Sequence, residues 1–365
     1  MSKTNKTVAV GMSGGVDSTI AIALLQEKGY KVSGITMSFW EEATFVEDKA
    51  VFTAGCFTPL EKGRLENIKK LCAKFGIAHH TIDLQKEYKK CVLDYFTSTY
   101  TKGKTPNPCV MCNKFIKFGA FFKTALKQGV DAKHFATGHY ARVGFSRKEN
   151  RFVLKKALDK QKDQTYFLWA LSQDILSKVI FPLGNMTKKE TFAMAKKLGL
   201  KMFDEKKESQ DFIPPSAYKA LFKGKKFEVG DIVDTSGKKV GTHKGIIYYT
   251  VGQRRGLGIG GILEPIFVKR IDAKNNLIVV CKKEELYSCE MNLCDVNWVS
   301  INEPKGKIVA KIKIRQQHLP ATADIFPMPN NKAKVVFKKP QLSITSGQSA
   351  VFYKGDILLG GGIIV

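Results

Sequence analysis

The chain has 365 residues, of which 44% are hydrophobic and 25% are charged, and this balance is typical of a globular protein with about two or three domains. No segment approaches the ~18 consecutive apolar residues of a membrane helix, and the polar start predicts no signal peptide, so we expect a cytoplasmic protein with no membrane partner. The 60 Lys and Arg residues against 33 Asp and Glu give a net charge of +27. This excess favours a polyanionic partner such as nucleic acid, and the alternative is a solvated lysine-rich surface.

The first half of the chain alternates short apolar runs with segments of helical spacing. Strands are predicted at residues 8–10, 31–38, 77–84 and 133–137. A first helix is predicted after the loop at 11–19 and ends at Gly29. Further helices are predicted at residues 60–75, 88–100, 114–126, 164–179 and 188–198, with a loop at 41–58. Such alternation predicts an α/β fold with a parallel sheet covered on both faces. Ligands of these folds bind beyond the carboxyl ends of the strands.

The second half is rich in Gly, Thr and Val, and short alternating runs replace the helical spacing. Strands are predicted at residues 227–233, 246–250, 265–271, 277–281, 307–314, 321–326, 333–337 and 349–353. We therefore predict three domains: a nucleotide-binding domain at 1–207, a small central β domain at 208–285 and a C-terminal β-barrel at 286–365.

The segment Gly-Met-Ser-Gly-Gly-Val-Asp-Ser-Thr at 11–19 joins the first predicted strand to the first helix. Adjacent glycines allow a sharp turn, and a helix start presents unpaired amides that attract phosphate. Asp17 adds a carboxylate that could hold Mg²⁺. The Gly-Lys-Ser/Thr ending of a Walker loop is absent, and an ordinary glycine-rich turn is the alternative. The predicted phosphate-binding residues are Gly11, Met12, Ser13, Gly14, Gly15, Val16, Asp17 and Ser18.

A second informative segment is Thr-Pro-Asn-Pro-Cys-Val-Met-Cys-Asn-Lys at 105–114. Its two thiols, Cys109 and Cys112, precede the predicted helix at 114–126, and a helix start favours the thiolate form. The pair could be a reactive dithiol, half of a metal site, or a chance spacing. A structural zinc ion would need a second Cys or His pair, and Cys281, Cys289 and Cys294 lack that spacing.

The segment Ser-Gly-Gly-Val-Asp-Ser at 13–18 resembles the pyrophosphatase loop (PP-loop) of enzymes that split ATP between its α and β phosphates. Other blocks follow in order: Thr-Pro-Asn-Pro-x-x-x-Cys-Asn-Lys at 105–114, Ala-Thr-Gly-His-Tyr at 136–140, Lys-Asp-Gln-Thr-Tyr-Phe at 162–167, Gly-Gln-Arg-Arg-Gly-Leu-Gly at 252–258 and Gly-Gln-Ser-Ala-Val-Phe-Tyr at 347–353. Nearly end to end, the set resembles the MnmA-type tRNA-specific 2-thiouridylases. The resemblance implies adenylation of the C2 oxygen of a wobble uridine by ATP with Mg²⁺. Sulfur transfer from a cysteine persulfide would follow.

The same resemblance implies roles for individual residues. Cys112 would be the catalytic nucleophile, and Met37 and Gly138 would border the nucleotide. We predict Cys109 and Asp17 as further catalytic residues. Arg254 and Arg255, which lie between glycines, are predicted to contact RNA phosphate, and a solvated surface is the alternative. The other predicted tRNA-contacting residues are Asn107, Pro108, Cys109, Lys162, Asp163, Gln164, Lys313 and Arg315. The implied partners are tRNA and a sulfur donor, either a cysteine desulfurase or a relay protein, and we expect a monomer.

The chain departs from the family pattern at two cysteine positions. Cys109 stands where relatives commonly have Asp, and the segment Glu-Ser-Gln-Asp-Phe-Ile-Pro at 208–214 lacks the second cysteine, the usual persulfide carrier. One hypothesis is that Cys109 and Cys112 act as persulfide carrier and resolving thiol. The rival hypothesis is that both thiols, with a third such as Cys56, ligate an iron–sulfur cluster.

Two other functions remain open at this point. An adenylating synthetase or amidotransferase for a small metabolite explains the loop at 11–18, but not the charge, the paired thiols or the predicted barrel. A non-catalytic RNA-binding relative explains the charge and the missing cysteine, but not the intact loop. Turnover of ATP to AMP that depends on tRNA separates these functions.

Overall fold

The computed structural model describes residues 6–39, 61–200, 219–222, 227–260 and 264–365. The predicted loop at 41–58, Cys56 and the segment 208–214 lie outside these ranges. The chain forms two compact units. The first comprises Met1–Val92, Cys109–Ala220 and Asp356–Leu358, and the second comprises Leu93–Pro108, Leu221–Gly355 and Leu359–Val365.

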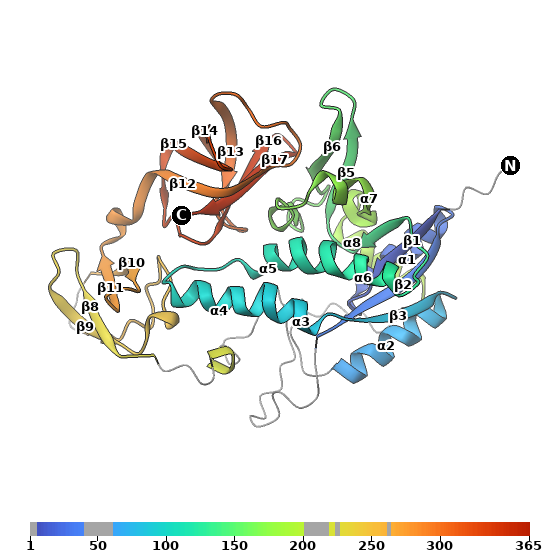
Figure 1. The fold of residues 1–365 in the computed structure, drawn as a ribbon, viewed down its shortest axis with the longest axis horizontal. Helices are drawn as coiled ribbons and strands as arrows, with labels where there is room; N and C mark the ends of the chain where they lie inside the picture. The colour runs from blue at the N-terminus through green and yellow to red at the C-terminus, as the bar shows by residue number, and fades with distance from the viewer. Residues whose placement is uncertain (1–5, 40–60, 201–218, 223–226, 261–263) are drawn as a thin grey trace. The chain divides into compact units, whose positions relative to one another are not determined.

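The first unit contains the predicted parallel sheet (Figure 1). Its five strands lie in the order β3-β2-β1-β4-β7, and each neighbouring pair is parallel. The strands are β1 (Thr7–Gly11), β2 (Lys31–Ser38), β3 (Ala78–Asp83), β4 (His134–Thr137) and β7 (Val179–Ile180). The predicted fold class is confirmed in this unit.

Helix α1 (Val16–Glu27) is buried on two sides, which is why its sequence is apolar nearly all round. One side packs with β1 and with Ile68 of α2 (Glu61–Lys74). The other side packs with Leu183 and with Ala195 of α8 (Lys188–Lys197). The sheet and the two neighbouring helices therefore hold the start of α1 in place.

The cysteine-bearing helix begins earlier than predicted. It runs without a break through α5 (Pro108–Met111), the π-helix η2 (Cys112–Phe121) and α6 (Phe122–Lys127). Proline fits the first helical position because it lacks the amide hydrogen that would be unpaired there. Cys109 therefore lies in the first turn and Cys112 one turn further on, rather than ahead of the helix. A similar helix is formed by α3 (Gln85–Tyr88), the π-helix η1 (Lys89–Leu93) and α4 (Asp94–Thr101).

One other prediction for the first half is wrong, and one hairpin was not predicted. The predicted helix at 164–179 is a 3₁₀ turn, η3 (Thr165–Phe167), followed by the short α7 (Gln173–Lys178). The Asp163 carboxylate accepts hydrogen bonds from Thr165, which fixes a turn where a helix was expected. The sequence analysis also missed a hairpin formed by β5 (Ala141–Ser146) and β6 (Arg151–Lys156), because its strands are short and charged.

The second unit contains a four-stranded sheet in the order β10-β11-β8-β9 and a closed six-stranded barrel. The sheet strands are β8 (Gly230–Val233), β9 (Lys239–His243), β10 (Phe267–Asp272) and β11 (Leu277–Cys281). The predicted strand at 246–250 is instead a 3₁₀ turn, η7 (Ile246–Tyr248), which follows Gly245 at φ 127°. The other 3₁₀ segments in the described ranges are η4 (Pro182–Asn185), η6 (Lys219–Phe222) and η8 (Lys283–Leu286).

The barrel strands lie in the order β12-β15-β14-β13-β16-β17, and pairing of β12 with β17 closes the barrel. Figure 1 shows these strands in orange and red. They are β12 (Tyr287–Trp298), β13 (Ile308–Lys313), β14 (Ala321–Met328), β15 (Lys332–Leu342), β16 (Ser349–Lys354) and β17 (Ile357–Ile364). The predicted C-terminal barrel is confirmed. Over the residues described, no helix is long and apolar enough to span a bilayer.

Candidate functional site

Hydrogen bonds from its own serine hydroxyl groups fix the conformation of the loop between β1 and α1. Gly14 has φ +84°, a conformation that favours glycine, and Gly15 is the residue before the first helical turn. The Ser13 hydroxyl accepts a hydrogen bond from the Gly15 amide at 3.3 Å, and the Ser18 hydroxyl donates to the Gly15 carbonyl at 3.0 Å. No side chain caps α1, so its first amides point to a position suited to a phosphate group.

Asp17, in the first turn of α1, forms the main ion pair beside this loop. Lys188 donates to both of its carboxylate oxygens, at 2.8 and 2.9 Å, and the Tyr140 hydroxyl donates to Oδ1 at 3.0 Å. The Lys188 side chain is only 11% exposed and that of Asp17 24%. Lys188 is the first residue of α8, behind the capping box of Thr187 and Glu190. The sequence analysis identified that helix start but missed the lysine as a site residue.

Two predicted nucleotide-bordering residues also lie at this loop. A side chain on Gly138 would meet the backbone of Asp17 and Ser18 at 2.7 Å, so the position requires glycine. Met37 lies near the end of β2, where its carbonyl accepts a hydrogen bond from Arg64 of α2 at 3.3 Å. The stem of Arg64 also lies 3.7 Å from where a Gly14 side chain would begin. Arg64 is a second cation at the loop that the sequence analysis missed.

The helix that carries the two thiols packs on the same sheet. A side chain on Gly11 would lie 3.3 Å from the ring of Phe121 in η2. Cys109 is half-buried, whereas Cys112 is 8% exposed. The neighbouring Asn113 donates from its side-chain amide to the Phe167 carbonyl at 3.2 Å, which ties the start of η2 to the loop that follows Gln164.

His139 follows Gly138 and lies among apolar rings. Its imidazole contacts Phe118 of η2 and Phe181, and its Nδ1 lies 2.7 Å from the Thr137 hydroxyl. Burial, with a smaller contribution from Lys117, lowers the pKa of His139 well below 6.5. The imidazole is therefore neutral at physiological pH. These contacts give His139 a packing role, and its ring supports the segment that carries Gly138.

Within the residues described, no three His, Cys, Asp or Glu side chains gather in a geometry that could hold a metal ion. Cys56, the third thiol considered for a cluster, lies outside the described ranges. Cys72, by contrast, is a core residue, and burial raises its pKa to about 11. Cys72 is therefore poorly suited to sulfur exchange.

The predicted tRNA-contacting residues of the first unit are partly engaged within the protein. The Asp163 carboxylate, 6% exposed, accepts hydrogen bonds from the Ala157 amide and from Thr165. The Gln164 side chain accepts one from the Tyr140 amide at 2.9 Å. The segment 162–164 is thereby connected, through Tyr140, to Asp17 and to the predicted phosphate loop, residues 11–18.

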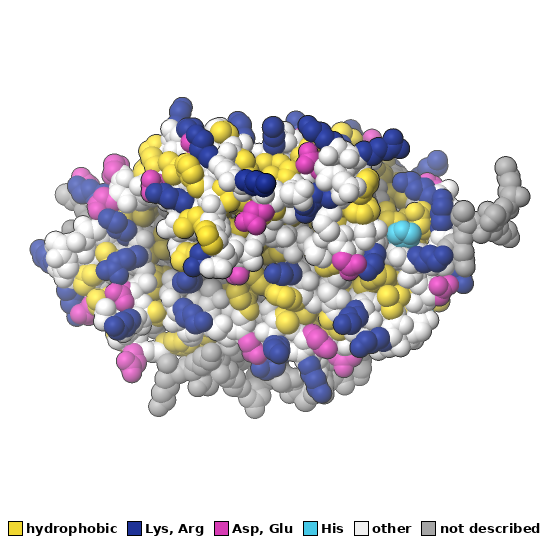
Figure 2. Space-filling model, turned by 45° about the horizontal axis from the view of Figure 1, so that its top comes forward, with side chains coloured by type: hydrophobic (Ala, Val, Ile, Leu, Met, Phe, Trp, Pro, Cys, Tyr) yellow, Lys and Arg dark blue, Asp and Glu magenta, His cyan; other side chains and the backbone are white. Residues whose placement is uncertain are grey.

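The predicted tRNA-contacting residues of the second unit differ in how far they are exposed. Arg254 and Arg255 are exposed in a glycine-rich loop, with Gly252, Gly256 and Gly258 all at positive φ. Lys313 ends β13 and is half-buried, and Arg315 donates to the Leu342 carbonyl. Asn107 and Pro108 are buried. Figure 2 shows Lys and Arg side chains spread over the visible face rather than gathered in one patch.

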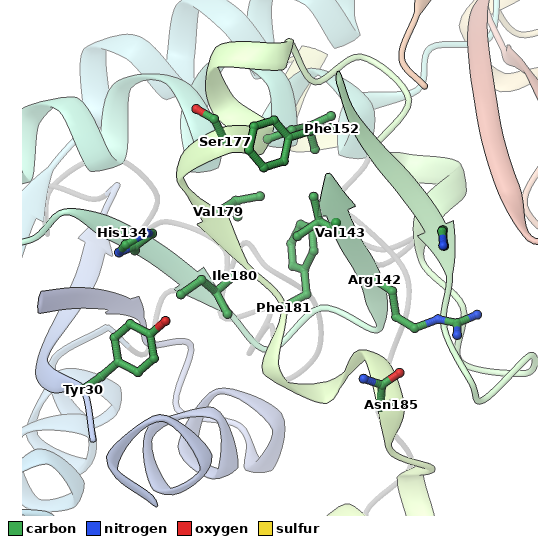
Figure 3. A pocket seen from close by; sticks show the side chains of 13 residues that line it. Tyr30, His134, Arg142, Val143, Phe152, Ser177, Val179, Ile180, Phe181 and Asn185 are labelled. Atoms are coloured by element: carbon green, nitrogen blue, oxygen red, sulfur yellow. The ribbon is translucent and has the colours of Figure 1, made fainter. Parts of the chain in front are cut away.

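A cavity of about 470 Å³ lies elsewhere in the first unit (Figure 3). Tyr30 and His134 line one side and Arg142 lines the other, with Val179 and Ile180 of the edge strand β7 between them. None of the predicted site residues lines this cavity. The candidate site is therefore the loop at the start of α1 and not this cavity.

Comparison with known proteins extends over nearly the whole chain. Residues 6–214 match the family model described as the tRNA methyl transferase HUP domain, 221–282 the tRNA methyl transferase PRC-barrel domain, and 288–364 the aminomethyltransferase β-barrel domain. A solved 4-thiouridine synthetase–RNA complex with bound ATP covers 59% of this chain and 49% of its own, at 18% identity and a TM-score of 0.33. That likeness is too distant to carry an argument.

Curated relatives match from end to end. The tRNA-specific 2-thiouridylase MnmA of Endomicrobium trichonymphae is 44% identical, with all of both chains covered. The enzyme of the same name from Acetivibrio thermocellus is 42% identical over 98% of this chain and 99% of its own. The family resemblance drawn from the sequence blocks is confirmed. The chain belongs to the MnmA family of tRNA-specific 2-thiouridylases.

Proposed function

We propose that this protein is a tRNA 2-thiouridylase that replaces the C2 oxygen of the wobble uridine with sulfur and consumes ATP. The observation that carries the proposal is the loop of Ser13 to Ser18 at the uncapped start of α1, in a chain that matches 2-thiouridylases along its whole length. The loop supplies a phosphate site, and the charge of +27 suits tRNA.

In the first step the uridine oxygen attacks the α-phosphate of ATP and pyrophosphate leaves. The amides at the start of α1 and the Ser13 hydroxyl bind the leaving phosphates, and the Ser18 hydroxyl holds the Gly15 carbonyl away from them. Lys188 and Arg64 place positive charge beside the same loop, where negative charge develops. Asp17 and Tyr140 keep the Lys188 ammonium group in position.

The predicted Mg²⁺ ligand, Asp17, does not fit that role in the arrangement described. Both of its carboxylate oxygens accept hydrogen bonds from Lys188, so a magnesium ion bound there would have to displace the ammonium group. Magnesium that accompanies ATP would neutralise phosphate charge, and we derive no step through it.

In the second step sulfur displaces AMP from C2. Cys109 carries the persulfide, and its terminal sulfur bonds to C2 as the bond from C2 to the adenylated oxygen breaks. The Cys112 thiolate then attacks Sγ of Cys109, which leaves 2-thiouridine and a disulfide between the two cysteines. A thiol reductant restores both thiols. The spacing of Cys109 and Cys112 supports a disulfide between them, since residues three apart on a helix share a face, with Cβ atoms ~5–6 Å apart.

The function is tested by mass spectrometry of nucleosides from tRNA incubated with the protein, ATP with Mg²⁺, and a cysteine desulfurase that supplies persulfide. The expected product is 2-thiouridine, with ATP converted to AMP only when tRNA is present. Cys112→Ser abolishes the product in either sulfur scheme. A methylated nucleoside in place of the thiolated one would instead support the methyl transfer named in the family-model descriptions.

Cys109 variants, and the dependence of thiolation on iron, distinguish the persulfide scheme from the iron–sulfur cluster scheme. If Cys109 carries the persulfide, Cys109→Ser and Cys109→Asp lose thiolation, and the wild type works in air without iron. If activity appears only after anaerobic iron–sulfur reconstitution, the thiols ligate a cluster instead, with a third ligand such as Cys56. Thiolation retained by Cys109→Asp would contradict both roles for Cys109.

The same proposal includes the sulfur donor, the oligomeric state, the location and the roles of the three domains. The sulfur donor is a cysteine desulfurase or a relay protein, and the enzyme works as a monomer in the cytoplasm. Residues 1–207 form its catalytic domain, 208–285 its central domain and 286–365 its tRNA-contacting barrel. The tRNA contacts are those predicted above, with the exposed Arg254 and Arg255 as the best placed. Light scattering of the protein with and without tRNA tests the monomer.

A further inference from the structure

The segment Thr105–Asn107, just before the thiol-bearing helix, is held by side chains and backbone that lie 240 or more positions later in the chain. The Gln348 side-chain amide donates to the carbonyls of Thr105 and Pro106, at 3.4 and 2.9 Å. The Thr105 amide donates to the Ser346 carbonyl at 2.9 Å. All of these residues belong to the second unit.

The Gly347-Gln348 pair that makes these contacts is itself fixed. The Gly347 amide donates to the Ile364 carbonyl and the Ile364 amide donates to the Gln348 carbonyl, both at 2.8 Å. Gly347 has φ +90°, and a side chain there would lie 2.6 Å from the Thr105 carbonyl oxygen. Glycine is therefore required both by the backbone conformation and by the close approach of Thr105.

Further hydrogen bonds within the second unit also hold the Thr105–Pro108 segment. It belongs to no helix or strand before Pro108, and its two prolines have no amide hydrogen to donate. The Asn107 amide donates to the Tyr95 hydroxyl at 3.2 Å, and the Asn107 side chain donates to the Ser349 hydroxyl at 3.4 Å. Backbone carbonyls outside regular structure need such partners when they are buried.

We propose that Gln348 is a positioning residue for the sulfur chemistry. Its side chain fixes the carbonyls of Thr105 and Pro106, and this sets where Pro108 begins α5, the helix that carries Cys109 and continues into Cys112. This inference rests on the proposed function for its catalytic consequence. A displacement of about 1 Å at a reacting group can cost roughly a hundredfold in rate, so we expect kcat to fall by a larger factor than KM for tRNA rises.

The decisive variant is Gln348→Glu, which keeps the size of the side chain but replaces the donating amide with a carboxylate that faces two carbonyl oxygens. Gln317→Glu is the matched control, because Gln317 is an exposed barrel residue and the charge change is the same. Ser349→Ala, which removes the partner of the Asn107 side chain, is a second test should Gln348→Glu fold poorly. Thermal unfolding shows whether each of the three variants is as stable as the wild type.

The first measurement is hydrogen exchange of the peptide that covers residues 100–115 in the free protein. Gln348→Glu and Ser349→Ala should exchange faster there than wild type and Gln317→Glu. Steady-state thiolation should then show kcat reduced by about tenfold or more, with a smaller change in KM for tRNA because the other predicted tRNA contacts are untouched. Unchanged exchange, or a kcat equal to that of Gln317→Glu, would overturn the proposal. If the wild type makes no 2-thiouridine, the proposed function fails, and exchange alone still decides whether Gln348 holds the segment.

Discussion

Lys188 and Asp17 are 171 positions apart in the chain, yet they form the tightest charged contact beside the phosphate loop. Lys188 also lies against the rings of Tyr140 and Phe192, so its ammonium group is well shielded from water. A shielded ion pair is costly to break from one side, because the remaining charge loses its partner. The pair is therefore a sensitive point for both stability and ATP binding.

We predict that Lys188→Gln weakens binding of ATP by roughly tenfold or more and lowers the free energy of unfolding by about 2 kcal/mol. The variant removes a cation beside the phosphates and leaves the Asp17 carboxylate to repel them. Calorimetric titration with a non-hydrolysable ATP analogue measures the first effect and thermal unfolding the second. Lys189→Gln is the matched control, since Lys189 is exposed and adjacent. Equal ATP affinity in the two variants would contradict the role given to Lys188.

The neutral imidazole of His139 predicts a loss of stability in acid. Its pKa is lowered in the folded state, whereas in the unfolded chain it is about 6.5. Above about pH 6.5 neither state binds the proton, and as pH falls further only the unfolded state does, so the free energy of unfolding decreases. His139→Gln should therefore lose less stability than wild type between about pH 7 and pH 5.

Denaturant unfolding at several pH values measures this difference, with His80→Gln as the control. Burial also lowers the pKa of His79 and of His318, so part of the acid sensitivity should remain in the His139 variant. A pH dependence identical to that of wild type would show that His139 is not the group responsible.

At the scale of single elements, the first turn of α8 holds Lys188 in position. A variant of that turn tests this role without changing the lysine itself. The Thr187 hydroxyl accepts a hydrogen bond from the Glu190 amide at 3.2 Å, and the Glu190 carboxylate accepts one from the Thr187 amide at 2.7 Å. The Thr187 amide and hydroxyl, which both donate to the Glu190 carboxylate, hold the pKa of Glu190 below its usual value. Thr187→Ala should lower the free energy of unfolding by about 1 kcal/mol and weaken ATP binding less than Lys188→Gln does.

Thermal unfolding and nucleotide titration of Thr187→Ala check this expectation. Ser177→Ala serves as the control, because the Ser177 hydroxyl bonds to the Asp174 carbonyl within α7 and caps nothing. If the two alanine variants unfold at the same temperature, the capping box contributes no measurable stability.

The elements that the sequence predicts well are those specified by nearby residues. The loop at 11–18 and the start of α8 each depend on a few adjacent positions, and β2 and β11 match their predicted bounds. The predicted helix at 164–179 failed because a side chain, Asp163, provides competing hydrogen bonds. The pair Asp17–Lys188 and the bonds from Gln348 to Thr105 and Pro106 join residues far apart in the chain, and no local pattern reports them.

At the scale of the whole molecule, the net charge of +27 predicts that tRNA affinity falls steeply with salt concentration. Removing the cation that binds one phosphate should reduce the slope of log affinity against log salt by about 0.7 to 1. We expect Arg254→Ala/Arg255→Ala to lower that slope by roughly 1.4 to 2. Arg147→Ala/Lys148→Ala, in the turn of the β5–β6 hairpin, removes the same charge. Filter binding over a range of salt distinguishes the two double variants, and equal slopes would exclude a specific contact at Arg254 and Arg255.

The second unit includes Leu93–Pro108, a segment that interrupts the first unit along the chain. In evolutionary terms the barrel is therefore not a module that can be exchanged freely. A C-terminal half grafted from a relative must bring partners for the Thr105 and Pro106 carbonyls, and a single cut near residue 220 would separate Gln348 from both. Substitutions at 105–108 and at 346–349 should therefore be inherited together, and chimeras that respect this pairing should fold where simple fusions fail.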